Sequence, residues 1–178
     1  MMSDILQFSR SAAARSSMGR ASAMGIAACL TLIAVPAAAH VTIAPKGVKA
    51  GQVSTFVLKI PHGCAGAATT GLRVAVPGIL SDIEPQEKAG WTAAVTPATG
   101  GAGVGAKPAQ IAWTGGSIAS ANHAEFAFKA KVAADAKGRI YVPIVQQCGD
   151  AVERWIEIPA SPAAGEPDKP APAFEVKP

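Results

Sequence analysis

The feature that most limits the possible fold is a series of short β-rich segments separated by turns that contain glycine and proline. The clearest segment, 123–132, reads HAEFAFKAKV; its two phenylalanines lie on one side, and Glu125 and Lys129 lie on the other. Strict alternation of this kind is typical of a half-buried strand. Similar segments lie at 53–60, 72–76, 91–95, 111–113, 139–146 and 152–158. Short strands at this spacing predict an all-β protein, an antiparallel β-sandwich.

The N-terminal region has the pattern of a secretory signal. Three arginines and one aspartate lie within residues 1–20, residues 21–35 carry no charge, and alanines occupy 37–39. A basic region, a short apolar core and small residues at the cleavage site are typical of a signal peptide and too short for a membrane span. We expect a signal peptide over 1–39, a first mature residue His40, and a periplasmic protein that does not span the membrane.

A second interpretation of this region is lipidation. The segment 26–29, Ile-Ala-Ala-Cys, loosely matches a lipoprotein processing box. Cleavage there would leave apolar residues directly after the lipidated cysteine, where a polar tether is expected. Cleavage after Ala39 is therefore the favoured interpretation.

Removal of the leader changes the charge and the cysteine count. It carries three arginines and one aspartate, so its loss lowers the formal net charge from +4 to +2. No basic cluster remains to indicate nucleic-acid binding. Cys64 and Cys148 remain, and in an oxidising compartment they predict one disulfide, which would stabilise the fold by about 4 kcal/mol. A metal site using both cysteines is the less favoured alternative, because neither lies in a C-x-x-C motif.

An N-terminal histidine has special ligand chemistry. A free α-amine has a pKa near ~8, so it can bind a metal at neutral pH. The amine and the imidazole Nδ1 of His40 can close one chelate ring, an arrangement that suits the tetragonal preference of Cu(II). The plainer interpretation is that His40 merely follows the cleavage site and is exposed.

Trp155 and Glu125 are two further candidates for the metal site, because of the side of the strand on which each is expected to lie. Alternation in 152–158 places Val152 and Ile156 on an apolar side and Trp155 on the other side, among carboxylates. A tryptophan on a solvent face is unusual, because large aromatic residues mostly lie in cores. Glu125 lies on the polar side of its strand, where it is either a solvated carboxylate or a metal ligand.

Four segments carry a resemblance to a known family. HVTIAPKGVKAG, PGILSDIEPQEKAGWTAAV, HAEFAFKAKV and AVERWIEIP occur in this order, from His40 to about Pro159. Together they resemble the YcnI-like family of exported copper-binding proteins. The resemblance implies a cupredoxin- or immunoglobulin-like sandwich over 40–159 that binds Cu(II) through a brace made by one N-terminal histidine. It also implies a glutamate ligand and a tryptophan packed at the site, which fall on Glu125 and Trp155.

Other parts of the chain lie outside this pattern. The segment PHGC places His62 two residues before Cys64, so His62 is a candidate supplementary copper ligand if its loop folds toward His40. The simpler interpretation is a loop histidine beside a structural cysteine. His123 lies two residues before Glu125 and is expected to be an exposed strand histidine. Residues 160–178, rich in proline, alanine and charge, are expected to be disordered or extended.

The sequence thus predicts a periplasmic Cu(II)-binding protein for copper homeostasis, uptake or transfer, with no catalytic residue and no enzymatic turnover. The expected partners are periplasmic copper carriers and inner-membrane copper transporters. Every methionine lies at or before Met24, so the donors left favour Cu(II) over Cu(I). One alternative is a copper oxidase or monooxygenase that uses the same N-terminal histidine. Another is a structural β-sandwich that binds no metal.

Overall fold

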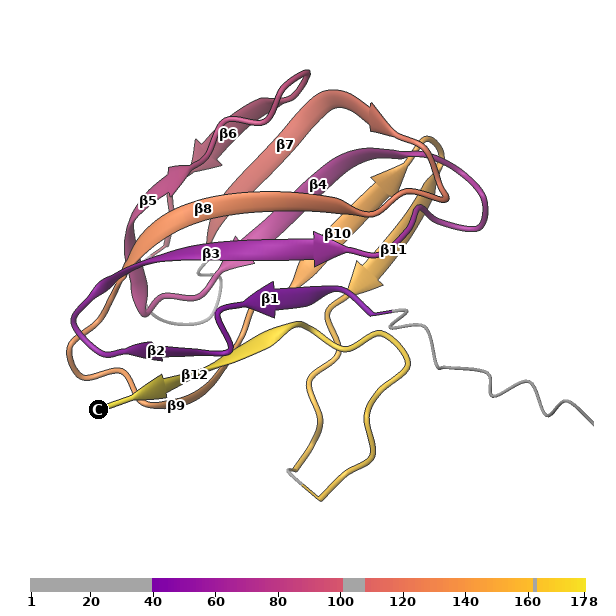
Figure 1. The fold of residues 1–178 in the computed structure, drawn as a ribbon. Helices are drawn as coiled ribbons and strands as arrows, with labels where there is room; N and C mark the ends of the chain where they lie inside the picture. Colours follow the sequence, from indigo (N-terminus) through magenta and orange to yellow (C-terminus); the bar gives the residue numbers. More distant parts are fainter. Residues whose placement is uncertain (1–39, 101–107, 162) are drawn as a thin grey trace, which may run out of the picture. The chain divides into compact units, whose positions relative to one another are not determined.

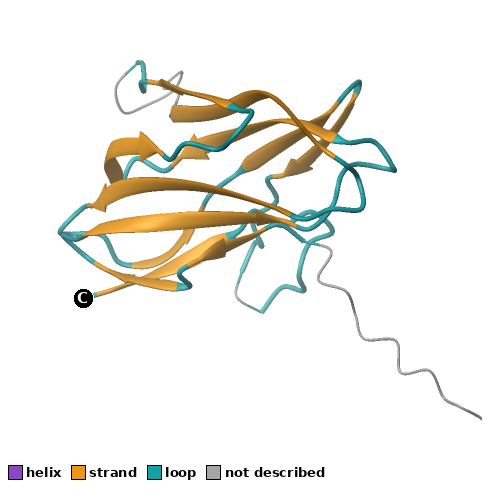
Figure 2. Cartoon of the chain, turned by 45° about the horizontal axis from the view of Figure 1, so that its top comes forward, coloured by secondary structure: helices purple, strands orange, loops and turns teal. Residues whose placement is uncertain are grey.

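The computed structural model describes residues 40–100, 108–161 and 163–178. The expected signal peptide lies outside these ranges, as does most of the glycine-rich segment 100–106, for which the sequence predicts a loop. The described chain consists of strands joined by loops and turns (Figure 2). It contains no helical segment with the length and hydrophobicity needed to cross a membrane.

The strands form three sheets (Figure 1). The four-stranded sheet is entirely antiparallel and has the order β1 (Thr42–Ala44), β3 (Val53–Ile60), β8 (Ala124–Val132), β5 (Leu80–Pro85). The five-stranded sheet is also antiparallel and has the order β11 (Ala151–Trp155), β10 (Ile144–Cys148), β4 (Thr69–Val76), β7 (Ala109–Ile118), β6 (Thr92–Thr96). The three-stranded sheet has the order β2 (Gly47–Lys49), β12 (Ala173–Lys177), β9 (Gly138–Tyr141), and β2 runs parallel to β12.

The core forms because alternate residues of the sheets meet. In β8 the exposure alternates as the sequence predicts: Phe126 and Phe128 are buried, and Glu125 and Lys129 are exposed. Phe126 packs against Trp113 of β7 with 5.4 Å between ring centroids, so the two larger sheets share one hydrophobic core. The prediction of an all-β antiparallel sandwich is confirmed.

The C-terminal region corrects one prediction. Residues 160–178 are predicted to be a disordered or extended tail outside the domain, but β12 lies between β2 and β9, and Phe174 is 1% exposed. The Phe174 ring lies 4.8 Å from the Phe56 ring in the core. The proline- and alanine-rich composition of the tail gave no sign of its short strand, AFEVK. The strands that pair with it, β2 and β9, are distant in the sequence. The folded domain therefore continues to Lys177, beyond the expected boundary at residue 159.

Candidate metal centre

His40 is held in place by the strand that follows it. Val41 and Ile43 are 2% and 1% exposed, and β1 pairs with β3. The buried side chains fix the backbone, and His40 remains partly accessible, with 35% of its side chain exposed. It lines a surface groove of about 420 Å³, together with residues of the 159–173 segment.

Two side chains face the imidazole of His40. The Nδ1 atom lies 3.3 Å from Oε1 of Glu166, whose side chain is 71% exposed. The ring of Trp155 meets the imidazole in an edge-on arrangement, with 6.0 Å between centroids. One nitrogen donor and one carboxylate therefore meet here, and the Trp155 ring forms an aromatic wall beside the imidazole.

The position of Trp155 corrects the sequence interpretation of its strand. Trp155 is 4% exposed, whereas Val152 and Ile156 are 44% and 43% exposed. The apolar and polar sides of β11 are thus the reverse of the prediction. The reason is a contact with another segment: Glu153 lies on the inner side as well, where it pairs with Lys169 of the C-terminal segment. Lys169 neutralises the charge of Glu153, and the alternation of residues within β11 cannot predict this contact.

Trp155 is oriented by a buried glutamine that the sequence analysis did not single out. Gln146 of β10 is fully buried, and its Oε1 accepts a 3.0 Å hydrogen bond from the Trp155 indole N–H. Its Nε2 donates to the carbonyl of His62 at 2.7 Å and to the hydroxyl of Thr69 at 2.8 Å. A polar residue at an inward-facing strand position was the signal available in the sequence. Gln146 links the loop of His62 to the aromatic wall beside His40.

We expect Gln146→Leu to destabilise the fold by about 1–3 kcal/mol, because it leaves the Trp155 indole N–H and the His62 carbonyl unsatisfied away from water. Urea unfolding followed by tryptophan fluorescence measures this change. Gln147→Leu, on the exposed side of the same strand, is the matched control and should change the unfolding midpoint little. Equal stability of the two variants would contradict the buried network.

The loop 61–67 carries His62 and one half of the disulfide. Cys64 is bonded to Cys148, which confirms the predicted disulfide. The His62 Nδ1 donates to the carbonyl of Gly63 at 2.6 Å, so the contact that it makes is with its own loop. Gly63 is required here because a Cβ would overlap the carbonyl of Ala67. Within the described residues, no contact joins the His62 imidazole to His40.

Glu125 forms an ion pair on the outer face of the four-stranded sheet. Its Oε1 lies 3.2 Å from Nζ of Lys59, and both side chains are about half exposed. Glu125 and Lys59 are directly opposite each other on β8 and β3, and Lys59 is in turn opposite Thr42 of β1. His123 lies in the exposed turn before β8. Over 40–100, 108–161 and 163–178, no three His, Cys, Asp or Glu side chains form a group able to hold a metal.

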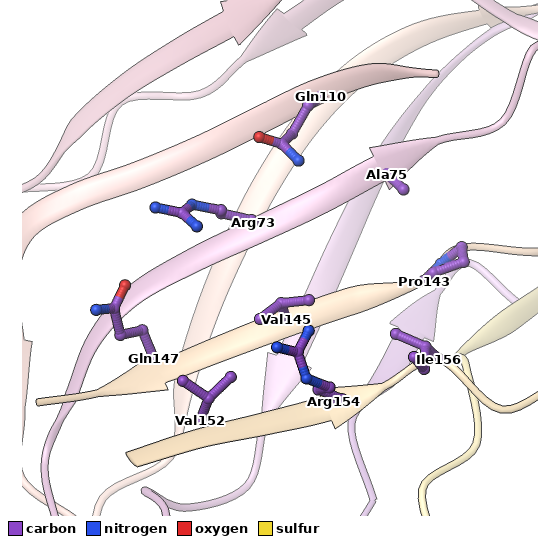
Figure 3. Close-up of a pocket in the computed structure, with 9 residues that line it drawn as sticks. All are labelled: Arg73, Ala75, Gln110, Pro143, Val145, Gln147, Val152, Arg154 and Ile156. Carbon is purple, nitrogen blue, oxygen red and sulfur yellow. The ribbon is translucent and has the colours of Figure 1, made fainter. Parts of the chain in front are cut away.

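A second groove, of about 360 Å³, lies on the outer face of the five-stranded sheet (Figure 3). Arg73 of β4 and Arg154 of β11 lie on either side of Val145 of β10, in one row across the three strands. The remaining residues of the groove are neutral: Ala75, Gln110, Pro143, Gln147, Val152 and Ile156. Two positive charges without a carboxylate repel a cation. The groove beside His40 also carries two cations, Lys46 and Arg139, but it has an imidazole and the Glu166 carboxylate as donors, so it is the better candidate for a metal.

Comparison with known proteins places the fold in a family. A profile described as a domain of unknown function, DUF1775, matches residues 40–176. The chain belongs to the DUF1775 family. The DUF1775 match starts at His40 and includes all of β12 except its last residue, in agreement with the extent of the folded domain.

A solved structure shares this fold. It is a crystal structure of an uncharacterized protein from Nocardia farcinica, reported to reveal an immunoglobulin-like fold. The two chains are 24% identical with a TM-score of 0.63, and the match covers 77% of this DUF1775 chain and 97% of the other. This similarity supports the immunoglobulin-like form of the predicted sandwich. No curated protein sequence matches the chain.

Proposed function

We propose that the exported protein binds one Cu(II) ion through the amine and the imidazole Nδ1 of an N-terminal His40, and that it acts in periplasmic copper homeostasis, uptake or transfer. The observation that carries this proposal is the setting of His40. Its Nδ1 faces a carboxylate, its ring lies against the buried Trp155, and the side chain is accessible from a groove.

The donor set of this end of the domain fits a cupric ion. Nitrogen and carboxylate donors suit Cu(II), and Cu(II) leads the Irving–Williams order among divalent first-row metals. Both cysteines of the domain are bonded to each other, so neither offers a thiolate. The Trp155 ring lies beside the imidazole and would limit the access of water. The resemblance to the YcnI-like family supports the same metal and adds Glu125 as a carboxylate ligand.

The role is that of a carrier and not of an enzyme. The partners that fit it are periplasmic copper carriers and inner-membrane copper transporters, which would deliver or accept the ion. Copper enzymes with an N-terminal histidine generally need a second histidine to complete a plane of three nitrogens. The His62 imidazole bonds to its own loop and His123 lies in an exposed turn, so neither supports such a plane.

Copper titration of the protein that begins at His40 tests the proposal. We expect one Cu(II) per chain, bound more tightly than by an unfolded peptide that begins His-Val-Thr, because the fold adds donors and excludes water. Isothermal titration gives the stoichiometry and affinity, electron paramagnetic resonance (EPR) reports the ligand nitrogens, and intact mass establishes the first residue. Affinity equal to that of the peptide would leave a metal-free structural sandwich as the better account.

A further inference from the structure

We infer that Glu166 supplies a carboxylate ligand to the metal ion held by His40. This inference rests on the proposed function and extends it to a residue of the C-terminal segment, far from His40 in the sequence. The structure brings the two side chains together at the same end of the domain, with 3.3 Å between Nδ1 of His40 and Oε1 of Glu166.

The distance between these two atoms suits two ligands of one ion. Imidazole nitrogens and carboxylate oxygens bind a divalent metal such as zinc at about 2.0–2.2 Å. With similar bond lengths, two neighbouring ligands at metal angles of roughly 90–110° lie about 2.9–3.5 Å apart. The separation of Nδ1 and Oε1 falls within this range. A cation could therefore replace the present contact with little movement of either side chain.

The imidazole atom that faces Glu166 is the one that the proposed copper chelate uses. A chelate ring with the α-amine of the same residue uses Nδ1, and Nδ1 is the imidazole atom beside the carboxylate. A carboxylate at that nitrogen adds a negative charge where the ion would lie, and it offsets part of the charge of Cu(II). Hard oxygen and imidazole nitrogen together are a donor set that Cu(II) accepts.

The segment that carries Glu166 is anchored to the end of β11. Glu157 donates its N–H to the carbonyl of Lys169 at 3.1 Å and accepts the N–H of Ala171 at 2.8 Å. Lys169 also pairs with Glu153. These contacts tie residues 169–171 to the strand that bears Trp155, so Glu166 is presented to His40 from a segment with fixed ends.

Glu125 has a different environment. Its carboxylate is already paired with Lys59 at 3.2 Å, on the outer face of the four-stranded sheet. Recruiting Glu125 to a metal requires that ion pair to open, whereas the Glu166 carboxylate has His40 as its ion-pair partner among the described side chains. Glu166 is thus the carboxylate that can join the ion without losing another salt bridge.

The test compares Glu166→Gln with Asp168→Asn, which removes a carboxylate from the same exposed segment. Both are prepared as the full domain beginning at His40, and the metal-free unfolding midpoint checks the fold. We expect Glu166→Gln to weaken Cu(II) binding by about tenfold or more and to shift the parallel g value and copper hyperfine coupling in EPR. Asp168→Asn should leave both unchanged.

Failure of the inference and failure of the proposed function give different results. If the unmodified protein binds Cu(II) tightly and Glu166→Gln keeps its affinity within about twofold with an unchanged EPR spectrum, the inference is overturned and the N-terminal brace stands. If Asp168→Asn weakens binding as much as Glu166→Gln, general charge and not ligation is responsible, which also overturns the inference. If the unmodified protein binds no better than the His-Val-Thr peptide, the proposed function itself fails.

Discussion

A four-residue extension, Gly-Ser-Gly-Pro, placed before His40 is expected to lower Cu(II) affinity by about 100-fold or more. It moves the free amine away from the imidazole, and the proline has no amide N–H to supply a replacement nitrogen, so the chelate ring is lost. Loss of outer contacts to a metal ligand already costs about 10–100-fold, and this change removes a ligand itself. Isothermal titration of two preparations, one beginning at His40 and one beginning with the four-residue extension, measures the effect. Intact mass confirms each first residue.

The fold should tolerate this extension. Val41 and Ile43 anchor β1 in the core, and His40 lies before β1 with an accessible side chain. The metal-free unfolding midpoint is therefore expected to stay the same. The same four residues added after Pro178 are the matched control and should leave copper binding intact. An extended protein that retains both its affinity and its EPR spectrum would exclude the N-terminal brace.

The main strands of the sandwich could be predicted from the sequence because each carries its own alternation. In β3 and β8, apolar residues recur at every second position, and these positions are buried as expected. In β11 the same rule assigned the buried and exposed sides of the strand the wrong way round. Val152 and Ile156 are exposed, and Glu153 is on the inner side because Lys169 neutralises it. The missing information was a contact between segments that lie apart in the sequence.

The candidate site shows the same limit. The chelating chemistry of His40 follows from its position after the expected cleavage site, and no folded structure is needed to recognise it. The Glu166 contact needs the C-terminal segment to pack on the domain, and composition predicted a disordered or extended tail there. Gln146 was also missed, because an inward-facing amide acquires meaning only when Trp155 and the loop of His62 are packed against it. Both contacts join residues that only the fold brings together, so the residue types alone could not predict them.

Removal of the disulfide is expected to destabilise the domain by about 4 kcal/mol, the magnitude for a bond that closes a loop of this length in the unfolded chain. Cys64 and Cys148 are 84 positions apart, and both are 1% exposed. The bond ties the loop of His62 to β10, next to Gln146, which accepts the indole N–H of Trp155. Its loss should therefore also loosen the aromatic wall beside His40.

The double variant Cys64→Ala and Cys148→Ala, compared with the unmodified protein in urea, measures the cost. Reductant provides the control: it should lower the midpoint of the unmodified protein toward that of the double variant and leave the double variant unchanged. Copper affinity of the double variant is expected to fall, and by less than with the four-residue extension before His40, because the amine and Nδ1 both remain. Equal urea midpoints for oxidised protein and double variant would mean that β10 and the loop of His62 hold together through Gln146 alone.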